Sequence, residues 1–322
     1  MDRSKKITIL SPCFNEELNV QECYERVKEQ LVLLNQTKGY DYEHIFIDND
    51  SKDHTVDILT DLAAKDKHLK LICNARNAGW ARSMFYGLTQ CYGDAVILIE
   101  SDLQTPPQYI PEFVKKWEEG YKVVAGVKAR STENPLMFRI RKLFYSLLNG
   151  MSETEIIPNF LGVGLYDQSF VEQLRNIDDP YPFFRGMVAE LGTDITTLPY
   201  NQEVRKKGKS SFNFFGMYDL AMLGFTSYTK MPLRLASFVG YITAFICIII
   251  ALVGLVEKCL HWDTFEVGLA AVQVGLFFLG SVQLIFLGII GEYISAIFVQ
   301  VRKRPLVIEK KRINFDEGDS VK

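Results

Sequence analysis

A short acidic segment, A-V-I-L-I-E-S-D-L-Q-T-P-P at residues 95–107, carries the side chains with the clearest chemical potential. An apolar run of strand type at 95–99 is followed by Glu100, Asp102 and Gln104. In an open α/β sheet, ligands bind at the carboxyl ends of the strands. Two carboxylates and an amide oxygen suit a hard cation that keeps water and shares phosphate oxygens. The segment therefore predicts a cation site; an acidic loop after a buried strand is the alternative.

The residues before this segment alternate between strand and helix patterns. We expect strands at 7–10, 44–47, 69–73, 95–99 and 122–127, with helices at 16–34, 55–64, 81–91 and 107–117. Such alternation is typical of an α/β protein with a mainly parallel sheet covered on both faces. The strand-to-helix junctions would then form one rim, and helix capping alone is the alternative role for their polar residues. Those residues are Asn15, Glu16, Asp48, Asn49, Ser51, Asp53, Arg76 and Gly79.

Composition separates the chain into two parts. Of the 322 residues 48% are hydrophobic, and the net charge of −3 gives no support for a nucleic-acid partner. The six cysteines form no C-x-x-C pair, which favours free thiols in a reducing compartment. The first residues, M-D-R-S-K-K, run directly into a strand pattern, so we expect no signal peptide.

Two long apolar runs occupy the C-terminal part. Residues 235–256 and 267–290 contain no charged side chain, and as helices they would extend about 33 and 36 Å, enough for a hydrocarbon core of roughly 30 Å. We predict a transmembrane hairpin, with buried core helices as the alternative. Lys230 and Arg234 precede it, Arg302, Lys303 and Arg304 follow it, and the connecting loop is acidic. The positive-inside rule then places the N-terminal part in the cytoplasm.

Taken together, these motifs resemble family 2 glycosyltransferases of the GT-A (Rossmann-like) type. The resemblance is closest to the polyprenyl-phosphate branch, which includes bactoprenol glucosyltransferases and dolichol-phosphate mannose synthases. It covers nearly the whole chain, through S-P-C-F-N-E-E, D-N-D-S-K-D-H-T, R-N-A-G, E-S-D-L-Q-T-P-P, G-K-S-S-F, P-L-R, the hairpin, and G-E-Y-I followed by R-K-R-P-L-V-I. The L-Q-x-P-P motif and the order P-L-R, hairpin, G-E-Y are the most specific parts.

The resemblance implies inverting transfer of a hexose from a nucleotide sugar, with UDP-glucose the default donor, to undecaprenyl (polyprenyl) phosphate. Asp102 and Glu100 would be catalytic, and with Gln104 they would hold Mg²⁺ or Mn²⁺ on the diphosphate. The residues implied to contact the donor nucleotide are Pro12, Asn15, Glu16, Asp48, Asn49, Ser51, Arg76 and Gly79. Those implied to contact the acceptor phosphate are Arg130, Arg139, Arg205 and Lys209. For these cations, a solvated basic run or a contact with anionic lipid is the alternative.

Departures from the family pattern leave two alternatives open. The family usually has Asp at Glu100 and Gly at Asp50, and it often has an acidic residue followed by F-R-L where this chain has G-V-G-L at 162–165. Ser211 also replaces a common Lys. Another UDP- or GDP-sugar donor, or a catalytically degenerate membrane scaffold, would account for these differences.

The expected organisation follows from these boundaries. It comprises a cytoplasmic GT-A domain at 1–204, an amphipathic juxtamembrane segment of interfacial helices at 205–234, the hairpin at 235–298 and a cytoplasmic basic tail at 299–322. The protein would be integral to the inner (plasma) membrane, with a nucleotide sugar, a polyprenyl phosphate and membrane lipids as partners. Glycines in the two spans are compatible with a homo-oligomer: Gly240, Gly254, Gly275 and Gly280.

Overall fold

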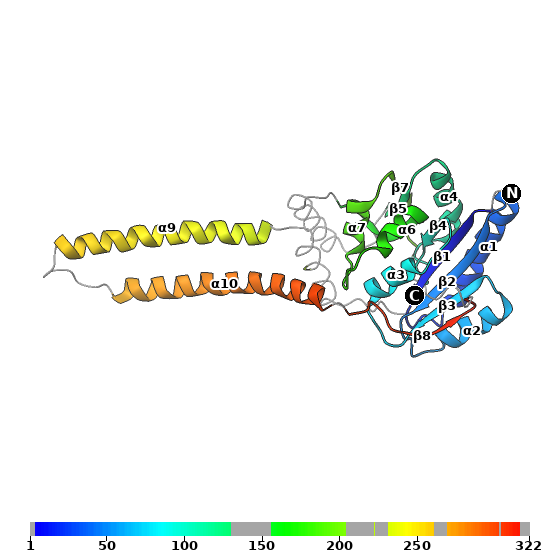
Figure 1. Cartoon of the computed structure of the whole chain (residues 1–322), viewed down its shortest axis with the longest axis horizontal. Coiled ribbons are helices and arrows are strands. Elements are labelled where there is room, and N and C mark those ends of the chain that lie inside the picture. The colour runs from blue at the N-terminus through cyan, green and yellow to red at the C-terminus, as the bar shows by residue number, and fades with distance from the viewer. Residues whose placement is uncertain are drawn as a thin grey trace.

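The computed structural model describes residues 4–129, 156–203, 222, 231–260, 269–302 and 304–315 (Figure 1). Its strands form one sheet in the order β7-β5-β6-β4-β1-β2-β3-β8. The strands are β1 (Lys6–Cys13), β2 (Asp41–Asp48), β3 (Leu69–Asn74), β4 (Ala95–Leu98), β5 (Val123–Lys128), β6 (Phe160–Asp167), β7 (Ile195–Tyr200) and β8 (Glu309–Ile313). The helices around the sheet are α1 (Val20–Lys38), α2 (Thr55–Lys65), α3 (Trp80–Thr89), η1 (Pro107–Tyr109), α4 (Ile110–Glu118), α6 (Gln168–Arg175) and α7 (Phe184–Leu191).

Four neighbouring strands, β4, β1, β2 and β3, run parallel, as the sequence predicts. Their side chains alternate between the two faces, because successive residues of a strand point to opposite sides. On one face, Ile9 and Phe46 pack with α1, α2 and α4. On the other face, Leu10 and Ile47 pack with α3, α6 and α7. The sheet is therefore covered on both faces, which confirms the predicted α/β class.

The helix predicted to start at residue 16 begins later, at Val20. Asn15 has a φ of 53°, in the left-handed region. The carbonyl of Glu16 then accepts the N–H groups of Asn19 and Val20, at 2.8 and 3.0 Å. A turn therefore separates β1 from α1 and holds Asn15 and Glu16 at the sheet edge, outside the helix.

Strands that the sequence analysis did not predict complete the two edges of the sheet. β6 lies antiparallel between β4 and β5, and β7 lies parallel to β5. At the opposite edge β8 pairs antiparallel with β3. Arg312 of β8 donates hydrogen bonds to Glu309 at 2.7 Å and to Gln90, the residue that follows α3, at 2.6 Å. The segment predicted as a basic tail thus contributes an edge strand to the domain.

Two long apolar helices project from the sheet domain and lie side by side (Figure 1). They are α9 (Met231–Leu260) and α10 (Leu269–Val301), of 30 and 33 residues, or about 45 and 50 Å at 1.5 Å per residue. Both contain a stretch long and apolar enough to cross a membrane, Leu233–Ile250 and Phe278–Val301, with no residue of either stretch buried. Large apolar side chains such as Phe238 and Ile250 are 63% and 65% exposed. This surface is suited to lipid rather than to water.

Candidate active site

The carboxyl ends of β1, β2, β3 and β4 meet at one edge of the sheet, because these strands are neighbours and parallel. The structure therefore brings together the loops that the sequence predicted as a rim. Each loop carries its own candidate site residues: Asn15 and Glu16 after β1, Asn49 and Ser51 after β2, Arg76 and Gly79 after β3, and Glu100, Asp102 and Gln104 after β4.

The loop after β4 is fixed at its centre by a buried leucine. Leu103 has a φ of 61° and is only 6% exposed. Positive φ is unusual for a bulky residue and is retained where the surroundings impose it, often at functional sites. The hydroxyl of Ser101 donates to the carbonyl of Pro12 at 2.9 Å, and the N–H of Gln104 donates to Asp102 Oδ1 at 3.1 Å. Packing and hydrogen bonds together hold the acidic residues at the end of the strand.

Tyr200, at the end of β7, lies close enough to Glu100 and Asp102 for their negative charges to affect the pKa of its hydroxyl. The pKa of Tyr200 is raised to about 12, mainly by burial and in addition by the negative charges of Glu100 and Asp102. The two carboxylates therefore act on one buried hydroxyl. The sequence analysis did not identify Tyr200, because its strand lies far along the chain and carries no motif.

Gln104 also has a partner that the sequence analysis missed. Its side-chain oxygen accepts a hydrogen bond from Gln202, and its carbonyl accepts one from the N–H of Glu203 at 3.0 Å. An amide oxygen has two lone pairs, so Gln104 retains one acceptor site beyond the bond to Gln202. The segment that follows β7 is thus attached directly to the acidic loop.

The residues of the acidic loop fit a cation that takes part of its coordination from a substrate. Glu100 and Asp102 supply two carboxylates, and within the described residues no group of three or more His, Cys, Asp or Glu side chains forms a site. Mg²⁺ is commonly held by one or two carboxylates, with substrate phosphates and water as its other ligands. This donor set fits such an ion better than one that needs an all-protein cage.

The loops after β1 and β2 are joined by reciprocal hydrogen bonds. The N–H of Asn15 donates to Ser51 Oγ at 2.8 Å, and Asn15 Oδ1 accepts the N–H of Lys52 at 2.8 Å. The N–H of Glu16 donates to Thr55 Oγ1 at 2.9 Å. Helix capping was the alternative role for these polar residues. Here they connect one loop to the other.

Asp48 and Asp50 explain the shape of the loop after β2. Asp48 is buried, which raises the pKa of its carboxyl, although the N–H groups of Ser51 and Asp50 donate to it, each at 3.1 Å, and lower that pKa. Asp50 has a φ of 67°, in the left-handed region that favours glycine. The family's usual glycine at this position therefore has a conformational reason, and Asp is among the residues that tolerate it.

Asn49 connects the loop after β2 with the loop after β3. Its Oδ1 accepts from Asn74 Nδ2 at 3.1 Å and from the N–H of Ala78 at 2.9 Å, while its Nδ2 donates to Asn77 Oδ1 at 2.9 Å. Gly79 follows with a φ of 87° and starts α3. Asn49 is only 5% exposed, so it positions the loop that carries Arg76.

Gly162, where the family often has an acidic residue, lies in β6 beside β4. Its φ is 107°, and an added Cβ would lie 3.4 Å from Phe184 and 3.6 Å from Trp80. Trp80 follows Gly79 directly and is 38% exposed. Two aromatic side chains therefore stand where the resemblance would place a polar group. Trp80 is therefore a further candidate site residue that the sequence analysis missed. Its place directly after Gly79, a predicted donor contact, was the signal that could have identified it.

The four predicted acceptor contacts, Arg130, Arg139, Arg205 and Lys209, lie outside the described residues. The predicted interfacial helices lie mainly outside them as well. Within the described residues, the N–H of Ala129 donates to the carbonyl of Tyr200 and the N–H of Glu203 donates to the carbonyl of Gln104, each at 3.0 Å.

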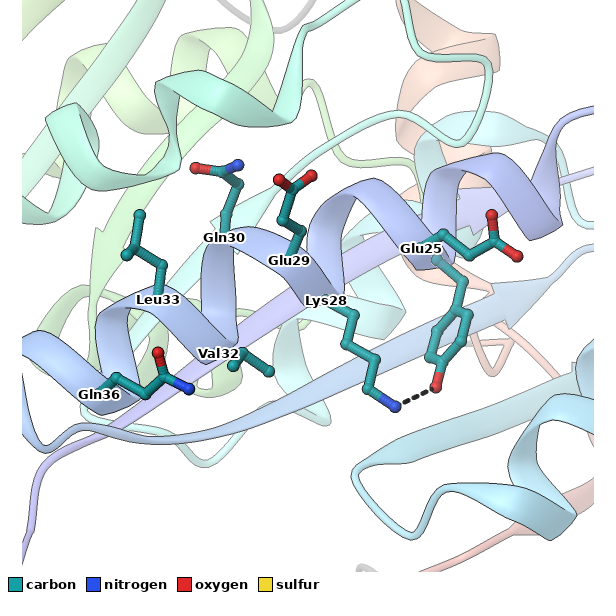
Figure 2. A pocket seen from close by; sticks show the side chains of 8 residues that line it. Glu25, Lys28, Glu29, Gln30, Val32, Leu33 and Gln36 are labelled. Atoms are coloured by element: carbon teal, nitrogen blue, oxygen red, sulfur yellow. Dashed lines mark hydrogen bonds between the residues drawn. The ribbon is translucent and has the colours of Figure 1, made fainter.

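A hollow on the outer side of α1 is separate from the rim. Its lining residues come from one helix, between Tyr24 and Gln36, and Lys28 donates to the Tyr24 hydroxyl at 2.9 Å (Figure 2). Lys28 also pairs with Asp66 at 2.8 Å. These contacts account for Lys28 as part of the scaffold.

The sequence model of the family described as Glycosyl transferase family 2 matches residues 8–175. This range contains the carboxyl ends of all four strands that contribute to the rim. The chain belongs to this family: it is a glycosyltransferase with a GT-A fold and two apolar C-terminal helices that could form a hairpin. The chain is 33% identical to the uncharacterized glycosyltransferase YkcC of Bacillus subtilis, and the alignment covers 97% of this chain and 95% of YkcC.

One further relative and one solved structure have more specific names. The SfII prophage-derived bactoprenol glucosyl transferase of Shigella flexneri is 33% identical over 95% of this chain and 98% of its own length. Among solved structures, the mannosyltransferase PcManGT of Pyrobaculum calidifontis, in complex with GDP-Man and Mn²⁺, is 14% identical. It covers 94% of this chain and 87% of that one, with a TM-score of 0.44.

Proposed function

We propose that this enzyme transfers a hexose, with UDP-glucose as donor, to undecaprenyl phosphate at the cytoplasmic face of the membrane. The product would be a polyprenyl-phosphate sugar for glycosylation of the cell envelope. Support comes from near full-length similarity to a bactoprenol glucosyl transferase and from two apolar helices next to the sheet domain.

The observation that carries this proposal is the single rim formed by four loops. This rim carries the carboxylates of Glu100 and Asp102, and hydrogen bonds of Asn15 and Asn49 join its loops. In the proposed complex, Asp102 and Glu100 would hold Mg²⁺ or Mn²⁺ on the donor diphosphate, with Gln104 as a third oxygen ligand. The bound ion would stabilise the charge that develops on the departing nucleoside diphosphate.

The nucleophile requires little activation. A phosphate monoester oxygen is already ionised at pH 7, so the site needs to orient the acceptor more than to deprotonate it. Attack from the face opposite the leaving group inverts the anomeric centre. The remaining predicted donor contacts, Pro12, Glu16, Asp48, Ser51, Arg76 and Gly79, would surround the nucleotide, and Arg130, Arg139, Arg205 and Lys209 would face the acceptor phosphate.

A transfer assay tests this proposal. The purified full chain would receive undecaprenyl phosphate, Mn²⁺ and a panel of radiolabelled UDP- and GDP-sugars, and label in the lipid phase would be measured. We expect transfer from UDP-glucose, with loss of about a hundredfold or more in Asp102→Asn, because a carboxylate that stabilises leaving-group charge is removed. EDTA should abolish transfer, and Mg²⁺ or Mn²⁺ should restore it.

Asp57→Asn is the matched control, since Asp57 lies on α2 with a side chain that is 79% exposed. It removes the same charge and should leave transfer unchanged. Full activity in EDTA would contradict the role of the metal. The absence of transfer from every sugar by a folded protein would favour a membrane scaffold instead.

A further inference from the structure

A second pocket is lined by residues at the end of α10, by the loop after β3 and by α3. It has a volume of about 300 Å³. Four arginines from three segments line it: Arg76 of the loop after β3, Arg82 of α3, and Arg302 and Arg304 after α10. We call it the arginine pocket. It includes part of the R-K-R-P-L-V-I motif, to which the proposed transfer reaction assigns no role.

The positive charge of this pocket has little internal compensation. Arg82 lies over the ring of Tyr181 at 4.8 Å, and Arg302 lies over the ring of Phe298 at 5.2 Å. Across the ranges that the structure describes, none of the four arginines forms an ion pair with a carboxylate. The Nε atom of Arg82 is buried and has no hydrogen-bond partner there. A buried donor without a partner is rare and costly, and its natural complement is an anion.

Asp179 lies at the same junction but is occupied by other groups. Its Oδ1 accepts the N–H of Tyr181 and Nε2 of Gln300, each at 2.9 Å. These bonds attach the last turn of α10 to the loop before α7. They fix the position of Arg302, two residues beyond Gln300, without neutralising it.

The pocket also lies at the end of the apolar stretch of α10. The apolar stretch of α10, Phe278–Val301, ends one residue before Arg302. If α10 crosses the membrane as proposed above, the pocket faces the cytoplasmic headgroup layer. Arginine presents a planar fork of donors that suits phosphate oxygens, and basic pockets beside membrane helices bind anionic headgroups.

We propose that the arginine pocket binds the phosphate group of a membrane lipid. This inference rests on the proposed function only in placing α10 in the membrane. The phosphate would belong either to an anionic phospholipid or to the polyprenyl phosphate. Arg76, a proposed contact of the donor nucleotide, and Asn77 also line this pocket, so the bound lipid phosphate and the nucleotide would both lie beside the loop after β3 that Asn49 holds.

The test measures lipid binding to the purified full chain by native mass spectrometry and by the shift of its thermal unfolding midpoint. The probes are phosphatidylglycerol, undecaprenyl phosphate, inorganic phosphate and, as the zwitterionic control, phosphatidylcholine. The variant is Arg302→Gln with Arg304→Gln; both side chains are exposed, so folding should be retained. The matched control is Lys310→Gln with Lys311→Gln, two exposed lysines of β8 outside the pocket.

We expect the arginine variant to bind its phosphate lipid about tenfold more weakly or worse, since charge-assisted hydrogen bonds are lost, and the lysine variant to bind like wild type. Preference for phosphatidylglycerol would identify a phospholipid headgroup, and preference for undecaprenyl phosphate would identify the acceptor. Inorganic phosphate competing with either lipid would support recognition of the phosphate itself.

Equal binding by wild type and arginine variant, equal loss in both double variants, or equal binding of phosphatidylcholine would overturn the proposal. No donor sugar is present in this experiment. A protein that binds through the arginines but transfers no sugar would therefore contradict the proposed function and leave the lipid site standing.

Discussion

At the scale of single residues, the rim depends on polar side chains that are buried in the domain. His44 of β2 lies under it, with Nε2 3.0 Å from Ser11 Oγ and its ring 4.2 Å from that of Phe46. Its Nδ1 is buried and has no partner within the described chain. Burial lowers the pKa of His44 from its ordinary value of 6.5 to about 3.

This burial predicts a dependence of stability on pH. Below pH 6.5 the unfolded chain takes up a proton at this histidine and the folded chain does not. The contribution of neutral His44 is therefore fully present above about pH 6.5 and is lost progressively as the pH falls toward 3. We expect the thermal unfolding midpoint of the full chain to fall between pH 7 and pH 5, and to fall less in His44→Gln.

The control for that measurement is His54→Gln, because the side chain of His54 is 80% exposed. Its midpoint should follow the wild-type curve over the same range. An unchanged slope in His44→Gln would show that groups other than His44 cause the acid sensitivity.

At the scale of elements, the site is a set of loops that share hydrogen bonds. Asn49→Ala removes three hydrogen bonds at once, those with the side chains of Asn74 and Asn77 and with the N–H of Ala78. Leaving buried donors unpaired costs about 1–3 kcal/mol, so the free energy of unfolding should fall by that order. The loop after β3 would loosen, and we expect the KM for the nucleotide sugar to rise more than kcat falls.

Asn35→Ala is the matched control, since Asn35 is exposed on α1 and bonds only locally, to the carbonyl of Tyr40 at 2.8 Å. It should change neither the free energy of unfolding nor the KM appreciably. If Asn49→Ala keeps the wild-type KM while losing stability, the side chain supports the fold without positioning the donor loop.

Elements also show what the sequence could and could not reveal. The parallel strands and their acidic, amide and glycine-bearing loops were predictable, because apolar runs and turn residues are local signals. β6, β7 and β8 were missed, since their places depend on pairing between distant residues such as Leu98 with Gly164 and Cys73 with Lys311. Tyr200 and Gln202 reach the site only through that long-range pairing. The predicted start of α1 was wrong, because an asparagine does not indicate a positive φ in the sequence as clearly as a glycine would, and Asn15 has such a φ.

At the scale of the whole molecule, the C-terminal strand restricts the topology. β8 pairs with β3 within the domain that precedes α9, so the chain must return to the side from which it left. Both helices therefore cross a membrane, or neither does. A single crossing would separate β8 from β3 and break the contacts of Arg312 with Gln90 and Glu309.

A native cysteine tests this directly. Cys259 is exposed at the far end of α9, whereas Cys13, Cys23, Cys73 and Cys91 are buried in the sheet domain. In the proposed orientation Cys259 lies close to the outer surface, since the following loop is the short connection between the two spans. A membrane-impermeant maleimide should therefore label Cys259 in intact cells, and Cys259→Ser should abolish that labelling.

The complementary probe is Lys310→Cys in the Cys259→Ser background, because Lys310 is exposed on β8. It should react only when the cytoplasmic face is opened, in inverted vesicles, since pairing with β3 keeps it with the sheet domain. Labelling of both positions from the same face would mean that the two helices lie along the membrane without crossing it. In that case the exposed apolar side chains of α9 and α10 would need another apolar surface to cover them. The argument that places the arginine pocket at a headgroup layer would then fail, because it depends on α10 crossing the membrane.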